Sequence, residues 1–108
     1  MTNIVSLDAV ELSAAIRRRD VSCRDVMLAY LAAIERHNPR HNAIVSLLDG
    51  DALLAQADAR DAQLARGEWL GWVHGFPQGV KDLAATRGLR TTMGSPIFRD
   101  QVPTEDAI

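Results

Sequence analysis

The chain has 108 residues, of which 47% are hydrophobic and 24% charged, and its formal net charge is −2. This composition is typical of a globular domain with a modest core, and the nearly balanced charge gives no electrostatic reason to expect nucleic acid or a membrane surface as a partner. The single cysteine, Cys23, excludes an internal disulfide, and no apolar run approaches the roughly 20 residues of a membrane span. We therefore expect a cytoplasmic protein.

A first amphipathic helix is predicted over residues 7–19. Ser6 or Asp8 can cap it, and apolar side chains and alanines recur behind them at helical spacing. The three arginines at 17–19 would fall in its last turn, where they complement the helix dipole. This structural interpretation is favoured over a basic recognition signal.

A second helix is predicted to begin at Ser22, which stands three residues before Asp25 at capping-box spacing. Apolar side chains follow on one face of this helix, as expected if it packs against a core. Asn38-Pro39 is expected to end it, because proline removes a helix hydrogen bond and restricts the residue before it.

After a short predicted strand at residues 43–48, an alanine-rich helix is predicted over residues 51–66, with Gly67 following its end. Residues 68–108 lose the helical period and read as strands and turns. The predicted organisation is therefore one α/β domain, 1–108, mainly helical with one short strand over 1–67 and rich in strands and turns over 68–108.

Lys81 is the strongest candidate for chemistry, because it lies in a short apolar run flanked by glycine. If residues 79–83 form a strand, Lys81 and Asp82 point to opposite faces, so Asp82 should not neutralise its neighbour. Gly79 shares the face of Lys81 and would let another group approach the amine closely. A buried lysine without a carboxylate partner can serve as a general base. The alternative is an ordinary lysine at a strand end with its ammonium in water.

Residues 71–83 read GWVHGFPQGVKDL, and residues 91–95 read TTMGS. This pattern resembles the first signature block of the amidase signature family, roughly G-P-L-H-G-[IV]-P-x-[GA]-[VI]-K-D, followed after a short gap by T-T-x-G-S. The departures are Trp72-Val73 in place of Pro-Leu and Gln78 where an apolar residue is commoner. The order of the earlier helices is also similar, and residues 106–108 resemble the start of the next family strand, which places the end of the chain within the family fold.

The resemblance implies a mixed sheet flanked by helices and an amide hydrolysis that needs no cofactor and no metal. In the family, the lysine that matches Lys81 completes a Ser–cis-Ser–Lys triad: its neutral amine takes a proton from the middle serine, which relays it from the nucleophilic serine. The product of the attack on a small-molecule amide substrate is an acyl-serine intermediate. Lys81 is thus the one catalytic residue that the resemblance assigns to this chain.

The two catalytic serines and the glycine-rich oxyanion loop lie far downstream of the lysine in family members. No serine of this chain stands in a loop of that kind, and Ser95 belongs to the T-T-x-G-S block, which the family uses as a wall near the lysine. We therefore expect the chain alone to be inactive. We also expect the remainder of the amidase polypeptide or a companion chain to pack against residues 73–108, with a homo-oligomer as another way to cover that surface.

Two other functions remain open from the sequence. One is a non-catalytic interaction fragment that keeps the helices and does no chemistry. The other is the glutamine-amidase subunit of a tRNA-dependent amidotransferase, which the resemblance disfavours because that subunit more often has Asn after its K-D and a cysteine in the T-T block.

The histidines and the cysteine are weaker candidates for a site. His37 and His41 have metal-ligand spacing on a helix, but Pro39 between them and the lack of a third ligand argue against a metal site. His74, between two glycines, is expected to bond to the backbone at a turn. Cys23 is expected to be a buried, unreactive thiol, although the start of a helix can lower a thiol pKa.

Overall fold

The computed structural model describes residues 3–107 and divides them into two compact units. The helical unit comprises residues 3–44 and 49–77, and the signature unit comprises residues 45–48 and 78–107. The regular elements of residues 3–107 are three α-helices and two short 3-10 helices. In chain order they are η1 (Ile4–Ser6), α1 (Ala9–Arg17), α2 (Cys23–His41), α3 (Gly50–Ala65) and η2 (Pro96–Phe98). Within the described residues, no helix combines the length and the hydropathy that a membrane crossing requires.

The first two α-helices begin where their capping residues predict. Asp8 and Glu11 form a complete capping box at the start of α1, and Ser22 and Asp25 form another at the start of α2. In each box the side chains satisfy backbone N–H groups that have no partner inside the helix. Helix α1 is shorter than predicted and ends at Arg17, so only this arginine of the three lies in the last turn.

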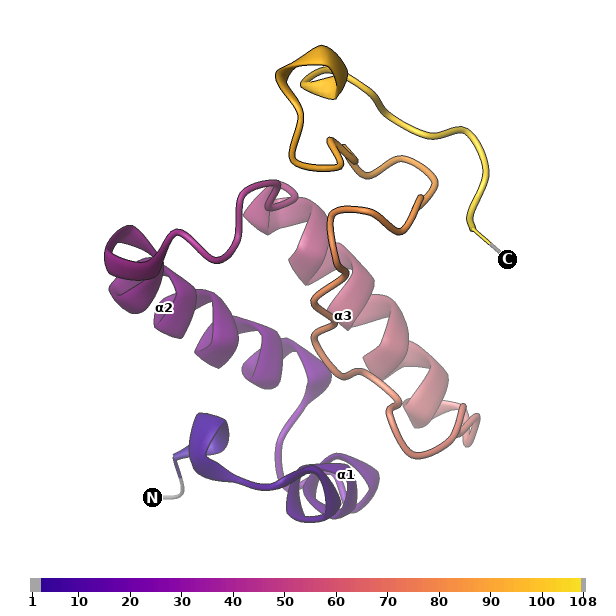
Figure 1. The fold of residues 1–108 in the computed structure, drawn as a ribbon. Helices are drawn as coiled ribbons and strands as arrows, with labels where there is room; N and C mark the ends of the chain where they lie inside the picture. Colours follow the sequence, from indigo (N-terminus) through magenta and orange to yellow (C-terminus); the bar gives the residue numbers. More distant parts are fainter. Residues whose placement is uncertain (1–2, 108) are drawn as a thin grey trace. The chain divides into compact units, whose positions relative to one another are not determined.

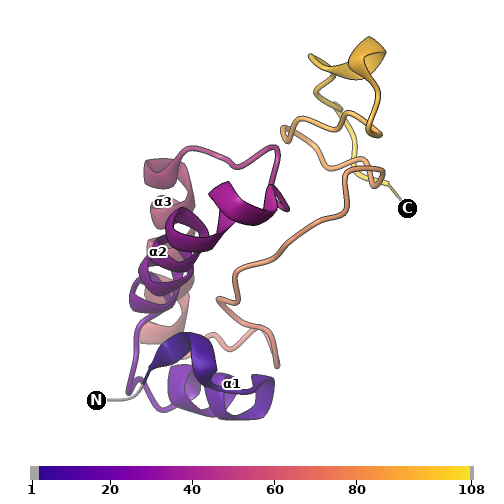
Figure 2. The same ribbon diagram turned by 60° about the vertical axis from the view of Figure 1, so that its left-hand side comes forward.

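Helices α2 and α3 pack side by side as an antiparallel pair, and α1 lies across one end of this pair (Figures 1 and 2). Their shared core contains buried side chains from all three helices: Leu12, Ile16, Cys23, Val26 and Ala57. Trp69 and Phe76 from the segment after α3 pack against the same cluster. The helical unit therefore closes a small core of its own, which burial of apolar area stabilises.

The predicted end of α2 at Asn38-Pro39 is wrong, because the helix continues through Pro39 to His41. Pro39 lies in the last turn, where its missing N–H removes only one helix hydrogen bond. Asn42 then ends α2 in the left-handed conformation, and its N–H bonds to the Asn38 carbonyl at 2.6 Å. The Asn38 side chain also exchanges two hydrogen bonds, each of 2.9 Å, with the backbone of Ile44.

The α/β fold class is confirmed only in part, because the described residues contain helices and no strand. Residues 43–48, predicted as a strand, are irregular, and residues 68–107 form turns, the short helix η2 and an antiparallel bridge between Thr86 and Leu89. A strand exists only where a neighbouring strand accepts its backbone hydrogen bonds. The predicted strand segments find no such ladder partner among residues 3–107.

The signature unit is held together mainly by backbone hydrogen bonds between residues 85–91 and 101–107. The N–H groups of Gly88 and Thr91 each donate at 3.0 Å to carbonyls at Pro103 and Gln101, and Ala107 donates to Ala85 at 2.7 Å. In the same unit, the Arg90 guanidinium donates to the Val45 carbonyl and to Ser46 Oγ, each at 3.1 Å. These bonds explain why residues 45–48 belong to this unit although they precede α3.

Candidate active site

Lys81 lies in an irregular segment, outside any helix, and the strand considered for residues 79–83 does not form. Its side chain is exposed, as are Gly79 and Val80 before it. The ion pairs of the described residues join Arg18 to Asp20, Arg24 to Asp58 and Arg66 to Glu68, so none of them engages Lys81. Lys81 is therefore free of a carboxylate partner within residues 3–107, but those residues do not bury it.

Asp82 binds the T-T block. Its carboxylate accepts a hydrogen bond from the Thr92 N–H at 2.7 Å and another from the Thr92 hydroxyl, and its backbone carbonyl accepts from the Met93 N–H at 2.8 Å. The Thr92 hydroxyl and then its N–H hold the pKa of the Asp82 carboxyl below its ordinary value, because both stabilise the charged form. No ion pair joins Asp82 to Lys81 among the described residues, but the opposite strand faces from which this was argued are absent.

These contacts join the two blocks of the signature. We call the hydrogen-bonded pair of Asp82 and Thr92 the signature clip. Sequence reasoning placed both residues in motifs but missed their bond, which joins positions ten residues apart in the chain. Thr91, next to the clip, is 2% exposed, and its hydroxyl donates to the Leu89 carbonyl at 3.0 Å. The clip gives the T-T block a structural role beside Lys81.

The clip is expected to open in acid. Because the folded-state pKa of Asp82 is lowered, its contribution to stability is present above the ordinary carboxyl pKa of about 4 and is lost as the pH falls through the lowered value. In the full-length polypeptide, the NMR shift of the Thr92 amide should titrate with a midpoint below that ordinary value.

Two variants control this prediction. Asp82→Asn should abolish the titration of the Thr92 amide, whereas Asp100→Asn, which changes an exposed carboxylate of the same unit, should leave it unchanged. A Thr92 midpoint at the ordinary carboxyl value in the unchanged protein would show that the clip does not form in solution.

All five serines of the chain take part in local structural hydrogen bonds. Ser13 Oγ donates to the Trp72 carbonyl at 2.7 Å, and Ser46 Oγ accepts from Arg90. The other three lie at turns or helix starts: Ser6, Ser22 and Ser95. None of them is hydrogen-bonded to a general base within the described residues, so no serine nucleophile is assigned among them.

His74 is 3% exposed and bonds to the backbone on both sides of its ring, as its position between two glycines predicts. Nδ1 accepts from the Leu70 N–H at 3.1 Å, and Nε2 lies 2.9 Å from the Arg60 carbonyl of α3. Its ring stacks on Trp69 with 5.2 Å between the centroids and 18° between the planes. His74 thus ties the G-x-x-H-G turn to the helices.

Cys23 is fully buried at the start of α2, as predicted. Burial first, and then the neighbouring Asp61 carboxylate, raises the pKa of its thiol to about 12. The Asp61 carboxylate also accepts from the N–H groups of Cys23 and Arg24, at 2.7 Å and 3.1 Å. This long-range helix cap was not foreseen, and it keeps the thiol neutral instead of activating it.

With α2 continuous through Pro39, His37 and His41 do lie on one helix, contrary to the expectation from sequence. Both are exposed. A group of three or more histidine, cysteine or carboxylate side chains arranged to hold a metal is not found within residues 3–107.

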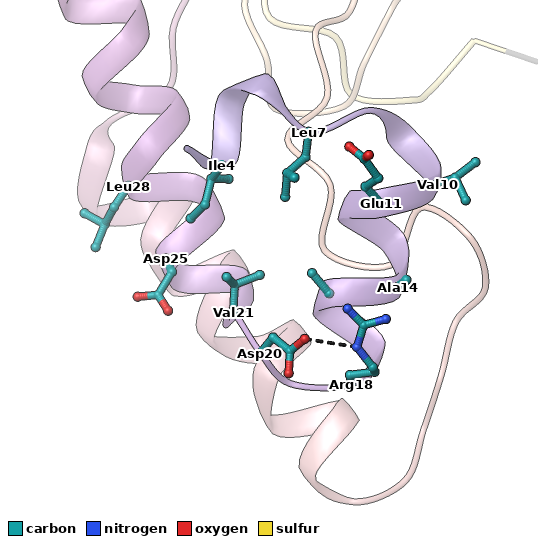
Figure 3. Close-up of a pocket in the computed structure, with 11 residues that line it drawn as sticks. Ile4, Leu7, Val10, Glu11, Ala14, Arg18, Asp20, Val21, Asp25 and Leu28 are labelled. Atoms are coloured by element: carbon teal, nitrogen blue, oxygen red, sulfur yellow. Dashed lines mark hydrogen bonds and ion pairs between the residues drawn. The ribbon is translucent and has the colours of Figure 1, made fainter. Parts of the chain in front are cut away.

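A pocket in the helical unit lies between η1, α1 and the start of α2 (Figure 3). Its volume is about 880 Å³, and its walls include Leu7, Val21 and Leu28. Glu11 and Asp25 at its edge serve the two capping boxes, and Asp20 pairs with Arg18 at 3.0 Å. The lining contains no residue of the 71–83 or 91–95 blocks.

Comparison with known proteins assigns most of the chain to a family. The sequence profile described as Amidase matches residues 25–108, which include most of α2, all of α3, the His74 turn, Lys81 and the signature clip. The match therefore covers two of the three α-helices and the candidate chemistry.

Curated relatives carry two kinds of name. A glutamyl-tRNA(Gln) amidotransferase subunit of Bdellovibrio bacteriovorus is 41% identical over 97 residues, which is 90% of this chain and 19% of the relative. The corresponding subunit of Acidothermus cellulolyticus is 41% identical over 107 residues, 99% of this chain and 21% of the relative. A Mycobacterium bovis protein provisionally named amidase AmiD is 39% identical over 104 residues, 96% of this chain and 22% of the relative.

The chain thus spans about one fifth of the length of these relatives. Names of both kinds occur at similar identity, so the comparison supports an amide hydrolase or a related amidotransferase without choosing between them. Since the family profile covers residues 25–108 and the Lys81 motif with them, the chain belongs to the amidase family.

Proposed function

We propose that the chain is the amino-terminal part of an amidase in which Lys81 is the general base of a Ser–cis-Ser–Lys triad. The observation that carries this proposal is the family match across the GVKD segment, in a structure where Asp82 is bound to Thr92 instead of Lys81. A lysine amine that is not paired with a carboxylate can be deprotonated and accept the proton of a serine.

The exposure of Lys81 fits a site that other residues complete. A general base of this kind needs a low-dielectric environment, and residues 3–107 leave the amine open to solvent. Apolar side chains of the same unit are also exposed, including Val80 at 42%, Leu83 at 59% and Ile97 at 86%. We place the rest of the amidase polypeptide, or a companion chain, over this surface, where it would supply the serines and bury the amine.

The reaction in this proposal is hydrolysis of a linear amide in two steps. A serine outside the described residues attacks the carbonyl, the middle serine relays its proton to Lys81, and ammonia or an amine leaves as the acyl-serine forms. Water then releases the acid. A cytoplasmic location is part of the same proposal.

The acyl-serine intermediate is tested by trapping it with hydroxylamine. The full-length polypeptide is expected to release ammonia from a simple carboxamide, and added hydroxylamine should convert part of the product from acid to hydroxamate, because it competes with water for the acyl-serine. Ammonia release with no hydroxamate at any hydroxylamine concentration would contradict the acyl-serine intermediate.

A second candidate function rests on the names of two relatives at 41% identity, which are amidotransferase subunits. In that case glutamine would be the amide substrate, and the ammonia would pass to glutamyl-tRNA. The two functions are separated by substrate: an amidase accepts simple amides without other subunits, whereas an amidotransferase subunit should require glutamine and its partner subunits for full turnover.

A further inference from the structure

The turn at residues 71–75 lies near the end of the helical unit, which extends to Pro77, and hydrogen bonds hold the turn on two sides. Ser13 Oγ of α1 holds the Trp72 carbonyl at 2.7 Å, and the His74 ring bridges the turn to α3. Within the turn, the His74 N–H bonds to the Gly71 carbonyl at 3.0 Å. The chain therefore leaves the helical unit from an anchored point.

The hydrogen bonds of His74 define its protonation state. The Leu70 N–H donates to Nδ1 at 3.1 Å, so Nδ1 must carry a lone pair and no proton. Nε2 then carries the proton of the neutral ring and donates to the Arg60 carbonyl at 2.9 Å. Both bonds exist together only in the neutral Nε2–H tautomer, and a second proton on Nδ1 would point at the Leu70 N–H.

No carboxylate among the described residues is placed to stabilise a positively charged His74 ring. From α1, the Arg17 guanidinium lies 5.3 Å from the centre of the Trp69 ring that stacks on His74. On α3, the Arg60 guanidinium donates a hydrogen bond to Gln63. The Asp61 carboxylate, on the same helix, accepts hydrogen bonds from the first two N–H groups of α2. Cys23 of α2 is a neutral, buried thiol. The described residues place no carboxylate in hydrogen-bond contact with the imidazole.

We propose that His74 is a positioning residue: its neutral Nε2–H imidazole fixes the point from which the Lys81 segment starts, and protonation of Nδ1 releases that point. The connection to Lys81 is covalent, through the six residues that separate them. Its effect on turnover rests on the proposed function, whereas the tautomer and the anchoring of the turn do not.

The tautomer is tested directly by nitrogen NMR of the histidine rings in the full-length polypeptide at neutral pH. The His74 signals are identified by their loss in His74→Gln. Nδ1 is expected at the shift of an unprotonated ring nitrogen and Nε2 at that of a protonated one. An Nδ1–H tautomer or a doubly protonated ring at neutral pH would overturn the proposal.

The release of the anchor is tested by amide hydrogen exchange of Leu70 and Phe76. In the unchanged protein, their protection factors are expected to fall when acidification protonates Nδ1, because the Leu70 N–H then loses its acceptor. In His74→Gln, whose amide nitrogen can replace Nε2 at the Arg60 carbonyl, this dependence on pH should be lost. Equal pH dependence in both proteins would contradict the release.

The effect on catalysis is tested with His74→Phe, which keeps an aromatic ring against Trp69 and loses both hydrogen bonds. Its kcat is expected to fall about tenfold or more, at a temperature where the protein stays folded, because small misplacements of a catalytic group cost rate. His74→Gln should retain more of kcat, and His41→Phe, at an exposed position of α2, should retain all of it. A folded His74→Phe variant with unchanged kcat would overturn the positioning role.

These readouts separate the two proposals. If Lys81→Ala were fully active, the proposed function would fail, while the NMR and exchange measurements would still decide whether His74 anchors the turn.

Discussion

Replacing Lys81 with alanine in the full-length polypeptide is expected to lower kcat/KM for amide hydrolysis by about 10⁴-fold or more, because a triad that loses its base cannot activate the serine. The unfolding temperature reports separately on stability, and within residues 3–107 Lys81 belongs to no ion pair that the substitution would break. Steady-state ammonia release and thermal unfolding of the two proteins measure the two effects.

The sharper variant is Lys81→Arg. Arginine keeps the positive charge but does not lose its proton at any working pH, so it cannot act as a base. If Lys81 is the base, the arginine variant should be as inactive as the alanine variant. If Lys81 only attracts a negative charge, Lys81→Arg should recover activity, and the base assignment would be wrong.

Arg87→Ala is the matched control, because Arg87 is another exposed cation of the signature unit, and its bond to Asp106 uses the backbone N–H. It should keep full activity. Lys81 is also the only lysine among the 108 residues, so a loss specific to Lys81 cannot be shared with a neighbouring ammonium group of this chain.

The helix starts were predictable because their signals are local. Ser22 and Asp25 form the predicted capping box. Asp8, one of the two predicted caps of the first helix, caps α1, and Glu11 completes a second box there. The C′ glycine after α3 is equally local: Gly67 follows the helix end with φ of 82°. Signals of this kind need no knowledge of the remaining fold.

The strands were not predictable in the same way, because a strand depends on a partner elsewhere. Residues 43–48 have a strand-like pattern, yet in the structure the backbone of Val45 binds Arg90. The end of α2 failed for a different reason: the cost of Pro39 is small in a last turn, and Asn38 and Asn42 stabilise the end two residues further on.

At the candidate site, the lack of an ion pair between Lys81 and Asp82 was predicted, although the strand from which it was argued does not form. The backbone bonding of His74 was predicted from its place in a turn between Gly71 and Gly75. The partners of these residues did not. The Asp82–Thr92 clip and the Arg60 contact of His74 join positions that only the folded chain brings together. Sequence reasoning could therefore name candidate residues, but not the contacts that hold them in place.

A large loss of stability is expected from Gly75→Ala, at the end of the 71–75 turn and directly after His74. Gly75 has φ of 75°, which alone disfavours a side chain, and a Cβ placed there would lie 3.0 Å from the Cys23 Cβ and inside contact distance of its sulfur. Strain of about 1 kcal/mol and overpacking of about 1–3 kcal/mol add to a loss of roughly 2–4 kcal/mol in the free energy of unfolding. Urea unfolding of the full-length polypeptide measures this loss.

Gly67→Ala isolates the backbone part of that effect, because Gly67 has a similar φ of 82° and no atom within 4 Å of an added Cβ. It should cost only about 1 kcal/mol. Adding Cys23→Ala to Gly75→Ala removes the sulfur from the collision, so the double variant should be more stable than the sum of the two single losses predicts, with a coupling of about 0.5–3 kcal/mol. Equal losses for the two glycine variants, or strictly additive losses for Cys23 and Gly75, would show that the turn does not press against α2, and the close packing of the 71–75 turn on the helical core would then have to be abandoned.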